Sequence, residues 1–388
     1  MDYIQQEFSV RFAYKVFFTS DLFNPSNILF DSFFKERNTA LLQKIFFVID
    51  QNVVNAHPHL SEKILAYFKK YDTVLLIEDI LVAPGGEAAK NDLTLFNKIV
   101  KAVNSNNIDR HSYIAAIGGG SVLDVTGYAA AVSHRGIRHI RIPTTTLSQN
   151  DSGVGVKNGI NYFNKKNFLG TFAPPVVVFN DDQFLLSLSD RDWRSGISEA
   201  VKVALIKDAD FFDWIENNAG KLVSRDINTM NYLIRRCAEL HIGHIAGGDP
   251  FETGSSRPLD FGHWSAHKLE LLTNFELLHG EAVVMGIALD SMYSSLSGRL
   301  PAEKAERIFQ LLFQLRFEIT HPLLQIEKNS DILSGLNEFR EHLGGLLTIM
   351  LLRDIGTGEE VHEIDIALLI EASRQLKRYS EIKTLNLK

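Results

Sequence analysis

One glutamate and three histidines in the second half of the chain have the side-chain types of a catalytic metal site. They are Glu199, His263, His267 and His279. His263 and His267 are four residues apart, so on a helix they share one face. A carboxylate with two or three imidazoles is a typical catalytic zinc ligand set with a position open for substrate. Because the sequence contains no HExxH motif and a single histidine is more often structural, both interpretations stay open at this point.

A glycine-rich turn in the first half has the composition of a phosphate-binding loop. Gly118, Gly119 and Gly120 precede Ser121, between an expected strand and an expected helix. Glycines let the backbone approach a phosphate closely, and a helix N-terminus offers free N–H groups to an anion. The turn is not a GxGxxG motif, so an ordinary turn remains the alternative.

Polar residues stand at the ends of three other expected strands. Asp50 ends a strand where a carboxylate can hold ribose hydroxyls. Glu87 closes a Pro-Gly-Gly-Glu loop, with Lys90 one turn later, and Thr144 and Thr145 follow a further strand. Ligands of open α/β sheets bind outside the carboxyl ends of the strands. The pattern therefore favours a dinucleotide site over four ordinary loops.

The elements that must position these residues fall into two halves. In the first half, short apolar runs alternate with helical patterns, which predicts parallel strands joined by right-handed crossovers. The expected strands are 44–50, 73–78, 113–117, 139–142 and 176–179, and the expected helices are 61–71, 92–103 and 122–133. After about Gln183, amphipathic patterns dominate, at 197–207, 210–223, 227–241, 280–295, 302–315 and 366–379, with one strand at 346–352. We expect a Rossmann-like α/β domain that binds the dinucleotide over residues 1–185, and a mostly α-helical domain that binds metal and substrate over residues 186–388.

Composition excludes several classes of protein. The chain has 388 residues, with 40 Lys+Arg against 47 Asp+Glu, a net charge of −7. Such a mildly acidic chain is a poor non-specific ligand of nucleic acid or anionic lipid. Its one cysteine, Cys237, excludes an internal disulfide framework and a cysteine-based zinc cluster. No apolar run approaches the roughly 18–20 residues that span a bilayer, and residues 1–6 do not resemble a signal peptide. We expect a cytoplasmic enzyme without nucleic-acid or membrane partners.

The motifs together resemble the sugar phosphate cyclases, the family of 3-dehydroquinate synthase. The matching segments keep the family's order and spacing from about Asp50 to Gly286, and they are 118–131, 135–161, 165–172, 196–208, 257–267 and 278–286. The wider fold includes glycerol dehydrogenase and iron-type alcohol dehydrogenases, which lack a stretch like 151–157. The resemblance implies an enzyme that uses NAD transiently, eliminates phosphate and closes a carbocycle, so that the net reaction is that of a lyase.

The resemblance also implies a role for each matching residue. Zinc or cobalt would be bound by Glu199, His263 and His279. NAD would be held by Asp50, Asn52, Glu87, Lys90, Gly119, Gly120, Ser121, Asp124, Thr144, Thr145 and Lys166. The sugar phosphate would be bound by Arg135, Lys157, Asn167, Lys202, Arg257, Asp260 and His342. The catalytic residues would be Asp151, Lys202, His267 and Glu252. Arg135 matches an arginine that reaches the substrate of the neighbouring subunit, which implies a homodimer.

The sequence departs from 3-dehydroquinate synthase where that enzyme binds the substrate carboxylate. The stretch 241–246 lacks the family's lysine, and Asp260 replaces an asparagine. An aspartate there would repel a carboxylate and favours a neutral polyol. Residues 339–345 and 360–362 resemble the C7-cyclitol branch, the 2-epi-5-epi-valiolone synthases that act on sedoheptulose 7-phosphate. By analogy, His342 would take over the role of a C-terminal lysine.

The match to that branch is incomplete, so alternatives stay open. Valiolone-type synthases tend to have proline where His267 stands, and the stretch 260–270 most resembles the dehydroquinate-synthase-like proteins of bacterial Ebo-type gene clusters. We expect a cyclase acting on a heptulose 7-phosphate, with sedoheptulose 7-phosphate favoured. The alternatives are 3-dehydroquinate synthase itself, an Ebo-type cyclase with an unassigned substrate, and a metal-dependent polyol dehydrogenase on the same fold. An inactive scaffold protein is disfavoured because all three implied metal ligands are present.

Overall fold

The computed structural model describes residues 2–37, 42–91, 93–163, 165–247, 250–251, 258–342 and 345–386. Its contacts divide the chain into two compact units. The first comprises Met1–Thr144 and Val156–Asp181, and the second comprises Thr145–Gly155 and Asp182–Lys388. Within the described ranges, no helix combines the length and the apolar character needed to cross a membrane.

The first unit is built on a parallel sheet of seven strands. Their order is β1-β9-β6-β5-β2-β3, and β4 also pairs with β2. The strands are β1 (Lys15–Thr19), β2 (Lys44–Asp50), β3 (Leu75–Leu76), β4 (Leu81–Ala83), β5 (Tyr113–Gly118), β6 (Arg138–Pro143) and β9 (Val177–Asp181). Every pairing in this sheet is parallel, which confirms the α/β prediction. The strand expected at 73–78 is shorter, because only Leu75 and Leu76 pair with β2.

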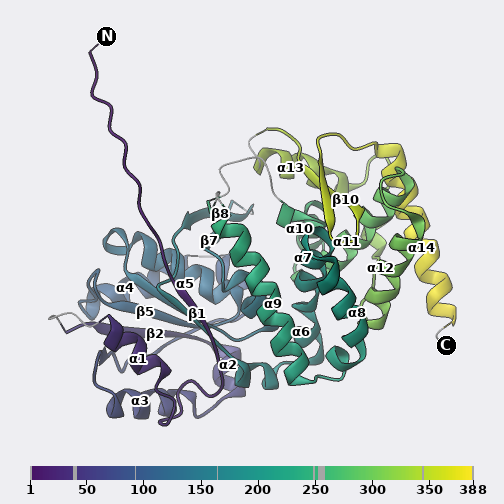
Figure 1. Cartoon of the computed structure of the whole chain (residues 1–388). Coiled ribbons are helices and arrows are strands. Elements are labelled where there is room, and N and C mark those ends of the chain that lie inside the picture. Colours follow the sequence, from purple (N-terminus) through teal and green to yellow (C-terminus); the bar gives the residue numbers. More distant parts are fainter. Residues whose placement is uncertain are drawn as a thin grey trace. The chain divides into compact units, whose positions relative to one another are not determined.

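Helices cover both faces of this sheet (Figure 1). The helices of the first unit are α1 (Leu29–Glu36), α2 (Gln51–Ala56), α3 (Leu60–Lys70), α4 (Thr94–Ser105) and α5 (Gly120–Val132). Side chains alternate between the faces of a strand. Phe46 of β2 therefore packs in one core cluster with α4 and α5, while Phe47 contacts Phe68 of α3 on the other side. A separate antiparallel hairpin, β7 (Lys157–Tyr162) and β8 (Lys165–Phe172), was not expected from the sequence.

The second unit is mostly helical, as predicted. Its helices are α6 (Asp190–Ser195), α7 (Ile197–Lys207), α8 (Ala209–Val223), α9 (Ile227–Ala246), α10 (His263–Leu272), α11 (His279–Leu296), α12 (Ala302–Gln314), α13 (Ser334–His342) and α14 (Ile366–Asn386). Helices α7 and α11 are buried on nearly every side, which matches their apolar sequences. The expectation of a single strand is wrong, because β10 (Ile349–Asp354) pairs with β11 (Thr357–Val361). The sequence of β11, Thr-Gly-Glu-Glu-Val, is too polar to show a strand pattern.

Helices α10 and α11 touch through their backbones at two glycines. A Cβ atom on Gly286 of α11 would lie 2.0 Å from the carbonyl oxygen of Gly262. Gly262 is the residue before α10 and has φ +76°, a conformation that favours glycine. This contact holds the start of α10 against α11, and the first residue of α10 is His263.

We predict that Gly286→Ala destabilises the protein by about 1–3 kcal/mol, because the new methyl group overlaps the backbone of Gly262. Urea denaturation would measure the free energy of unfolding. Gly220→Ala is the matched control, since a Cβ atom at that α8 position meets nothing within 4 Å. The control is expected to be neutral or stabilising. Equal unfolding free energies for the two variants would contradict the prediction.

Candidate active site

Three helices of the second unit bring a carboxylate and two imidazoles together. Glu199 lies in the first turn of α7, and His263 and His279 are the first residues of α10 and α11. The Nε2 atoms of His263 and His279 lie 3.8 and 3.7 Å from Oε1 of Glu199. Ligand atoms of a tetrahedral zinc ion are separated by about 3.3 Å, given zinc–ligand distances near 2.0–2.1 Å. The three side chains thus converge with nearly the spacing of a metal site.

The carboxylate of Glu199 is completely buried and only half satisfied. Oε2 contacts the ammonium group of Lys202, while Oε1 has no hydrogen-bond partner among the described residues. Burial raises the pKa of Glu199, and Lys202 opposes that shift. An unpaired buried carboxylate oxygen is costly, and a divalent cation would supply the missing partner. The donor set of one carboxylate and two imidazoles fits zinc or cobalt.

Both imidazoles are held so that Nε2 is the free nitrogen. Nδ1 of His279 lies 3.0 Å from Oε2 of Glu270, and Nδ1 of His263 lies 3.0 Å from the carbonyl oxygen of Phe261. Carboxylate and carbonyl oxygens only accept, so each Nδ1 donates its proton, and in the neutral imidazole this leaves the lone pair on Nε2 for a metal. Burial also lowers the pKa of His263 and favours its neutral form. Sequence reasoning did not identify Glu270, although it lies three residues after His267 on the same helix.

Asp290 ties the start of α10 to α11. It is buried and accepts hydrogen bonds from Nε1 of Trp264 at 2.9 Å and from the backbone N–H of Gly262 at 3.2 Å. Burial raises the pKa of Asp290 to about 7, although both hydrogen bonds oppose the shift. These bonds hold the residues on either side of His263, so they restrict the orientation of its ring.

His267, predicted to be catalytic, lies beside the two predicted histidine ligands. One ligand atom from each of the three imidazoles lies within 4.8 Å of the other two. The rings of His267 and His279 are stacked, with centroids 5.8 Å apart. A third imidazole at this position can exchange protons with a group bound at the metal site.

A histidine that sequence reasoning missed pairs with the predicted catalytic aspartate. Asp151 lies in η3 (Ser148–Ser152), and its Oδ1 is 2.8 Å from Nδ1 of His241 on α9. Burial alone would raise the pKa of Asp151, but His241 and Lys202 hold it well below its usual range. Only the absence of a lysine in 241–246 drew attention to this stretch of sequence. Its histidine could have been considered as the replacement.

The charge of Lys202 is surrounded by carboxylates. Burial would lower the pKa of Lys202, but the net shift is upward because Glu199, Asp151 and Asp260 stabilise the ammonium form. Lys202 therefore stays protonated although it is buried, because three predicted site residues of the second unit stabilise its charge.

At the carboxyl ends of β2, β4 and β5, several predicted cofactor residues lie close together in the first unit. Asp50 accepts a hydrogen bond from the N–H of Asn52 at 2.8 Å and another from the N–H of Gly119. Burial raises the pKa of Asp50 despite these bonds. A Cβ atom on Gly85 would lie 2.2 Å from Nδ2 of Asn52. These contacts show that three strand ends form one compact edge, as the sequence pattern predicted.

A second network links η1 (Glu87–Lys90) to α5 and to the β7–β8 hairpin. Glu87 accepts hydrogen bonds from Ser121 at 2.9 Å and from Asn161 at 3.1 Å. The buried Lys90 pairs with Asp124 at 2.9 Å and contacts Asn167. Burial would raise the pKa of Glu87, but Lys90 and Lys166 lower it. Asn161 was not predicted.

The remaining predicted residues are placed as follows. Gly120 is the first residue of α5, and Gly119 directly precedes the helix. The N–H of Thr144 donates to the carbonyl of Gly118 at 3.1 Å. Thr145 belongs to the second unit, in a turn with Ser148. Arg135 and Lys157 are exposed. Outside the described residues lie Glu252, Arg257 and the side chain of His342.

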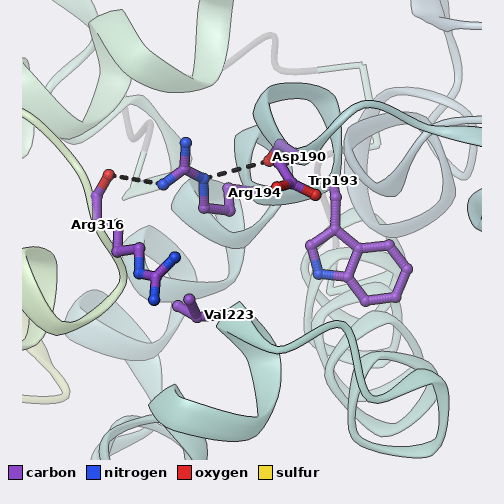
Figure 2. A pocket seen from close by; sticks show the side chains of 5 residues that line it. All are labelled: Asp190, Trp193, Arg194, Val223 and Arg316. Carbon is purple, nitrogen blue, oxygen red and sulfur yellow. Dashed lines mark hydrogen bonds between the residues drawn. The ribbon is translucent and has the colours of Figure 1, made fainter.

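A small pocket in the second unit involves none of the predicted site residues (Figure 2). Its lining residues are Asp190, Trp193, Arg194, Val223 and Arg316. The guanidinium group of Arg194 donates to the backbone carbonyls of Asp190 and Arg316 at 3.2 and 3.0 Å. These bonds brace the fold, and we assign the pocket no catalytic role.

The fold and the site define a class of enzyme in which a parallel-sheet unit of Rossmann type is joined to a helical unit with a metal-type donor set. Comparison with known families is more specific. Residues 80–195 match the 3-dehydroquinate synthase N-terminal domain, and residues 196–336 match the C-terminal domain. The chain belongs to the 3-dehydroquinate synthase family and is a sugar phosphate cyclase of that type.

Individual relatives agree with this assignment. The chain is 34% identical to 3-dehydroquinate synthase of Dictyoglomus turgidum over 326 residues, which are 84% of this chain and 89% of the relative. The chain is also similar to a solved structure of ValA, the 2-epi-5-epi-valiolone synthase from Streptomyces hygroscopicus subsp. jinggangensis 5008, with NAD+ and Zn2+ bound. The two share 27% sequence identity and superpose with a TM-score of 0.85. The match covers 97% of this chain and 100% of the ValA chain. A 2-deoxy-scyllo-inosose synthase solved with carbaglucose-6-phosphate, NAD+ and Co2+ shares the fold at 22% identity and a TM-score of 0.76, covering 93% of this chain and 96% of that one.

We predict that Glu270→Gln weakens zinc binding by about 10–100-fold, because the amide can present its NH2 group to Nδ1 of His279 and no longer fixes the ring. Competition with a chromophoric chelator would measure the zinc affinity. Glu338→Gln is the control, since Glu338 on α13 is half-exposed and pairs with Lys268 instead. Unchanged zinc affinity in Glu270→Gln would contradict the assigned role.

Proposed function

We propose that the protein is an NAD- and metal-dependent cyclase that converts a heptulose 7-phosphate, with sedoheptulose 7-phosphate favoured, into a C7 cyclitol with release of phosphate. The likeness to ValA at 27% identity supports this substrate class, and the family membership supports the reaction type. The protein would act as a homodimer, with Arg135 completing the phosphate site of the neighbouring subunit.

The first unit would hold NAD. Asp50 and Asn52 would bind ribose hydroxyls at the end of β2, and the free N–H groups of Gly120 and Ser121 would bind the pyrophosphate. The ion pair of Lys90 with Asp124 would keep η1 against α5. The other residues of this unit that are expected to complete the site are Glu87, Gly119, Thr144 and Lys166. When bound, NAD would accept a hydride from the carbon that bears a secondary hydroxyl and return it later in the same turnover, and the metal would polarise the oxygen of that hydroxyl.

The second unit would orient the sugar. Glu199, His263 and His279 would hold the metal, and Asp151, kept ionised by His241 and Lys202, would accept a hydrogen bond from a substrate hydroxyl. His267 would take up or release the hydroxyl proton.

The phosphate would be bound by side chains at the β7–β8 hairpin. Lys157 would bind it as a point charge, Asn167 through its amide group, and Arg135 of the partner subunit as a bidentate fork. Retention of these phosphate-type residues favours a cyclase over a polyol dehydrogenase on the same fold.

The observation that carries the choice of substrate is the additional carboxylate, Asp260, near the ammonium group of Lys202. Its ammonium group already contacts Glu199, and Asp151 and Asp260 act on it as well. His241 is paired with Asp151 at 2.8 Å. A substrate carboxylate placed here would meet carboxylates, whereas hydroxyl groups can donate hydrogen bonds to them. We infer a neutral polyol end on the substrate.

The second candidate is 3-dehydroquinate synthase itself, favoured by the 34% identity to the Dictyoglomus turgidum enzyme. An Ebo-type cyclase with another sugar phosphate is the third. All three share the proposed cofactor and metal sites and differ in the substrate end near Asp260.

We predict that the metal-loaded protein with NAD releases phosphate from sedoheptulose 7-phosphate without accumulating NADH. Phosphate and the absorbance of NADH would be followed together, with 3-deoxy-D-arabino-heptulosonate 7-phosphate as the carboxylate-bearing control. Release from the control substrate alone would make the protein a 3-dehydroquinate synthase. Accumulation of NADH without phosphate would instead indicate a dehydrogenase.

We also predict that Asp260→Asn shifts binding toward the carboxylate-bearing sugar phosphate, because it removes one negative charge beside Lys202. The ratio of the dissociation constants of the two sugar phosphates is expected to change about tenfold, the equivalent of about 1.4 kcal/mol. Calorimetry would measure both constants whether or not turnover occurs. Asp210→Asn, an exposed position on α8, is the control. An unchanged ratio in Asp260→Asn would count against the charge argument.

A further inference from the structure

The segment before β1 is an extended arm with one apolar face. Residues 2–14 form neither helix nor sheet and run away from the sheet of the first unit (Figure 1). Phe8, Val10 and Phe12 alternate along it and are 85%, 64% and 54% exposed. Glu7 and Arg11 alternate with these residues, so in an extended strand they would lie on the opposite face. Apolar residues at every second position are typical of a strand that packs one face against other apolar side chains.

The apolar face of the arm continues into the edge of the sheet. Val16 and Phe18 of β1 share the parity of Phe8, Val10 and Phe12, and Phe18 is also exposed. Among the described strands, β1 pairs only with β9, so its other edge is open. Long apolar edge segments left open in water promote pairing with another chain. The arm and β1 therefore present one continuous surface that suits an added strand.

We propose that the arm pairs with the arm of a second copy of this chain, antiparallel, with Ser9 on the two-fold axis. In this register, residues whose numbers sum to 18 face each other. Glu7 then lies opposite Arg11 of the partner subunit, and Phe8 lies opposite Val10 of the partner subunit. Opposite charges and apolar pairs directly across two strands are both favourable.

The distribution of charge selects this register and this partner. An axis at Arg11 would place two arginines face to face, and an axis at Ala13 would place Arg11 opposite Lys15 of the partner subunit. The arm itself supplies both members of each charged and apolar pair, which is the self-complementarity that a two-fold interface requires. Residues 5–13 would span about 30 Å, longer than a typical strand.

This inference goes beyond the proposed function, in which the homodimer rests on Arg135 alone and no segment is assigned to join the subunits. Its tests measure assembly and require no substrate. Failure of the cyclase assay would therefore leave them intact, and their failure would leave the cyclase proposal standing.

The first test is a disulfide at the proposed axis. The only native cysteine, Cys237, is buried, so Ser9→Cys adds a single accessible thiol to the full-length protein. Residues facing each other across antiparallel strands have Cα separations that a disulfide can bridge. Mild oxidation should give a covalent dimer on a non-reducing gel, which Ser26→Cys, on an exposed loop, should not. Equal cross-linking of the two variants would overturn the proposal.

The second test exchanges the charges. Glu7→Arg should weaken the dimer about tenfold, because it creates two like-charged pairs across the axis. The double variant Glu7→Arg with Arg11→Glu should restore the native affinity. Sedimentation velocity would measure the dissociation constant, with Glu62→Arg on the exposed face of α3 as the control. A monomeric native protein, a dimer that Glu7→Arg leaves intact, or a double variant as weak as the single one would each overturn the proposal.

Discussion

The candidate metal site of the second unit is arranged around one buried carboxylate oxygen. Oε1 of Glu199 has no hydrogen-bond partner among the described residues, while the two Nε2 atoms of His263 and His279 face it at under 4 Å. A buried acceptor left in this state costs free energy that the fold must offset elsewhere. Such an arrangement persists when the missing partner is a ligand that the site is built to bind. The fold is thus less stable than it would be with this oxygen paired, but three ligand atoms converge on one point before a metal binds.

The surrounding structure keeps those three side chains in place. Glu270 and the carbonyl of Phe261 fix the ring orientations, and Asp290 fastens the start of α10 to α11. The glycine contact of Gly262 with Gly286 lets those helices approach closely enough. Sites supported in this way by buried helices hold their geometry better than sites on loops. The burial of α7 and α11 therefore also helps to hold Glu199 and His279 in place.

The sequence predicted the regular elements well because their signals are local. The parallel sheet and α7 follow from apolar runs and periodicity, and α7 was placed with its observed bounds. The β7–β8 hairpin and β11 were missed because their sequences are polar and their pairing partners decide the structure. Glu270, His241 and Asp290 were missed because their roles depend on the partners that the fold brings to them, which are His279, Asp151 and Trp264. The roles of the site residues named from the resemblance remain predictions.

We propose that Glu199, His263 and His279 together bind one divalent metal ion. Crystals grown with cobalt and measured on both sides of its absorption edge would locate the ion directly. We expect one strong anomalous peak within about 2.0–2.2 Å of Oε1 of Glu199 and of both Nε2 atoms. An anomalous peak away from Glu199, or none at this position with cobalt in excess, would contradict it.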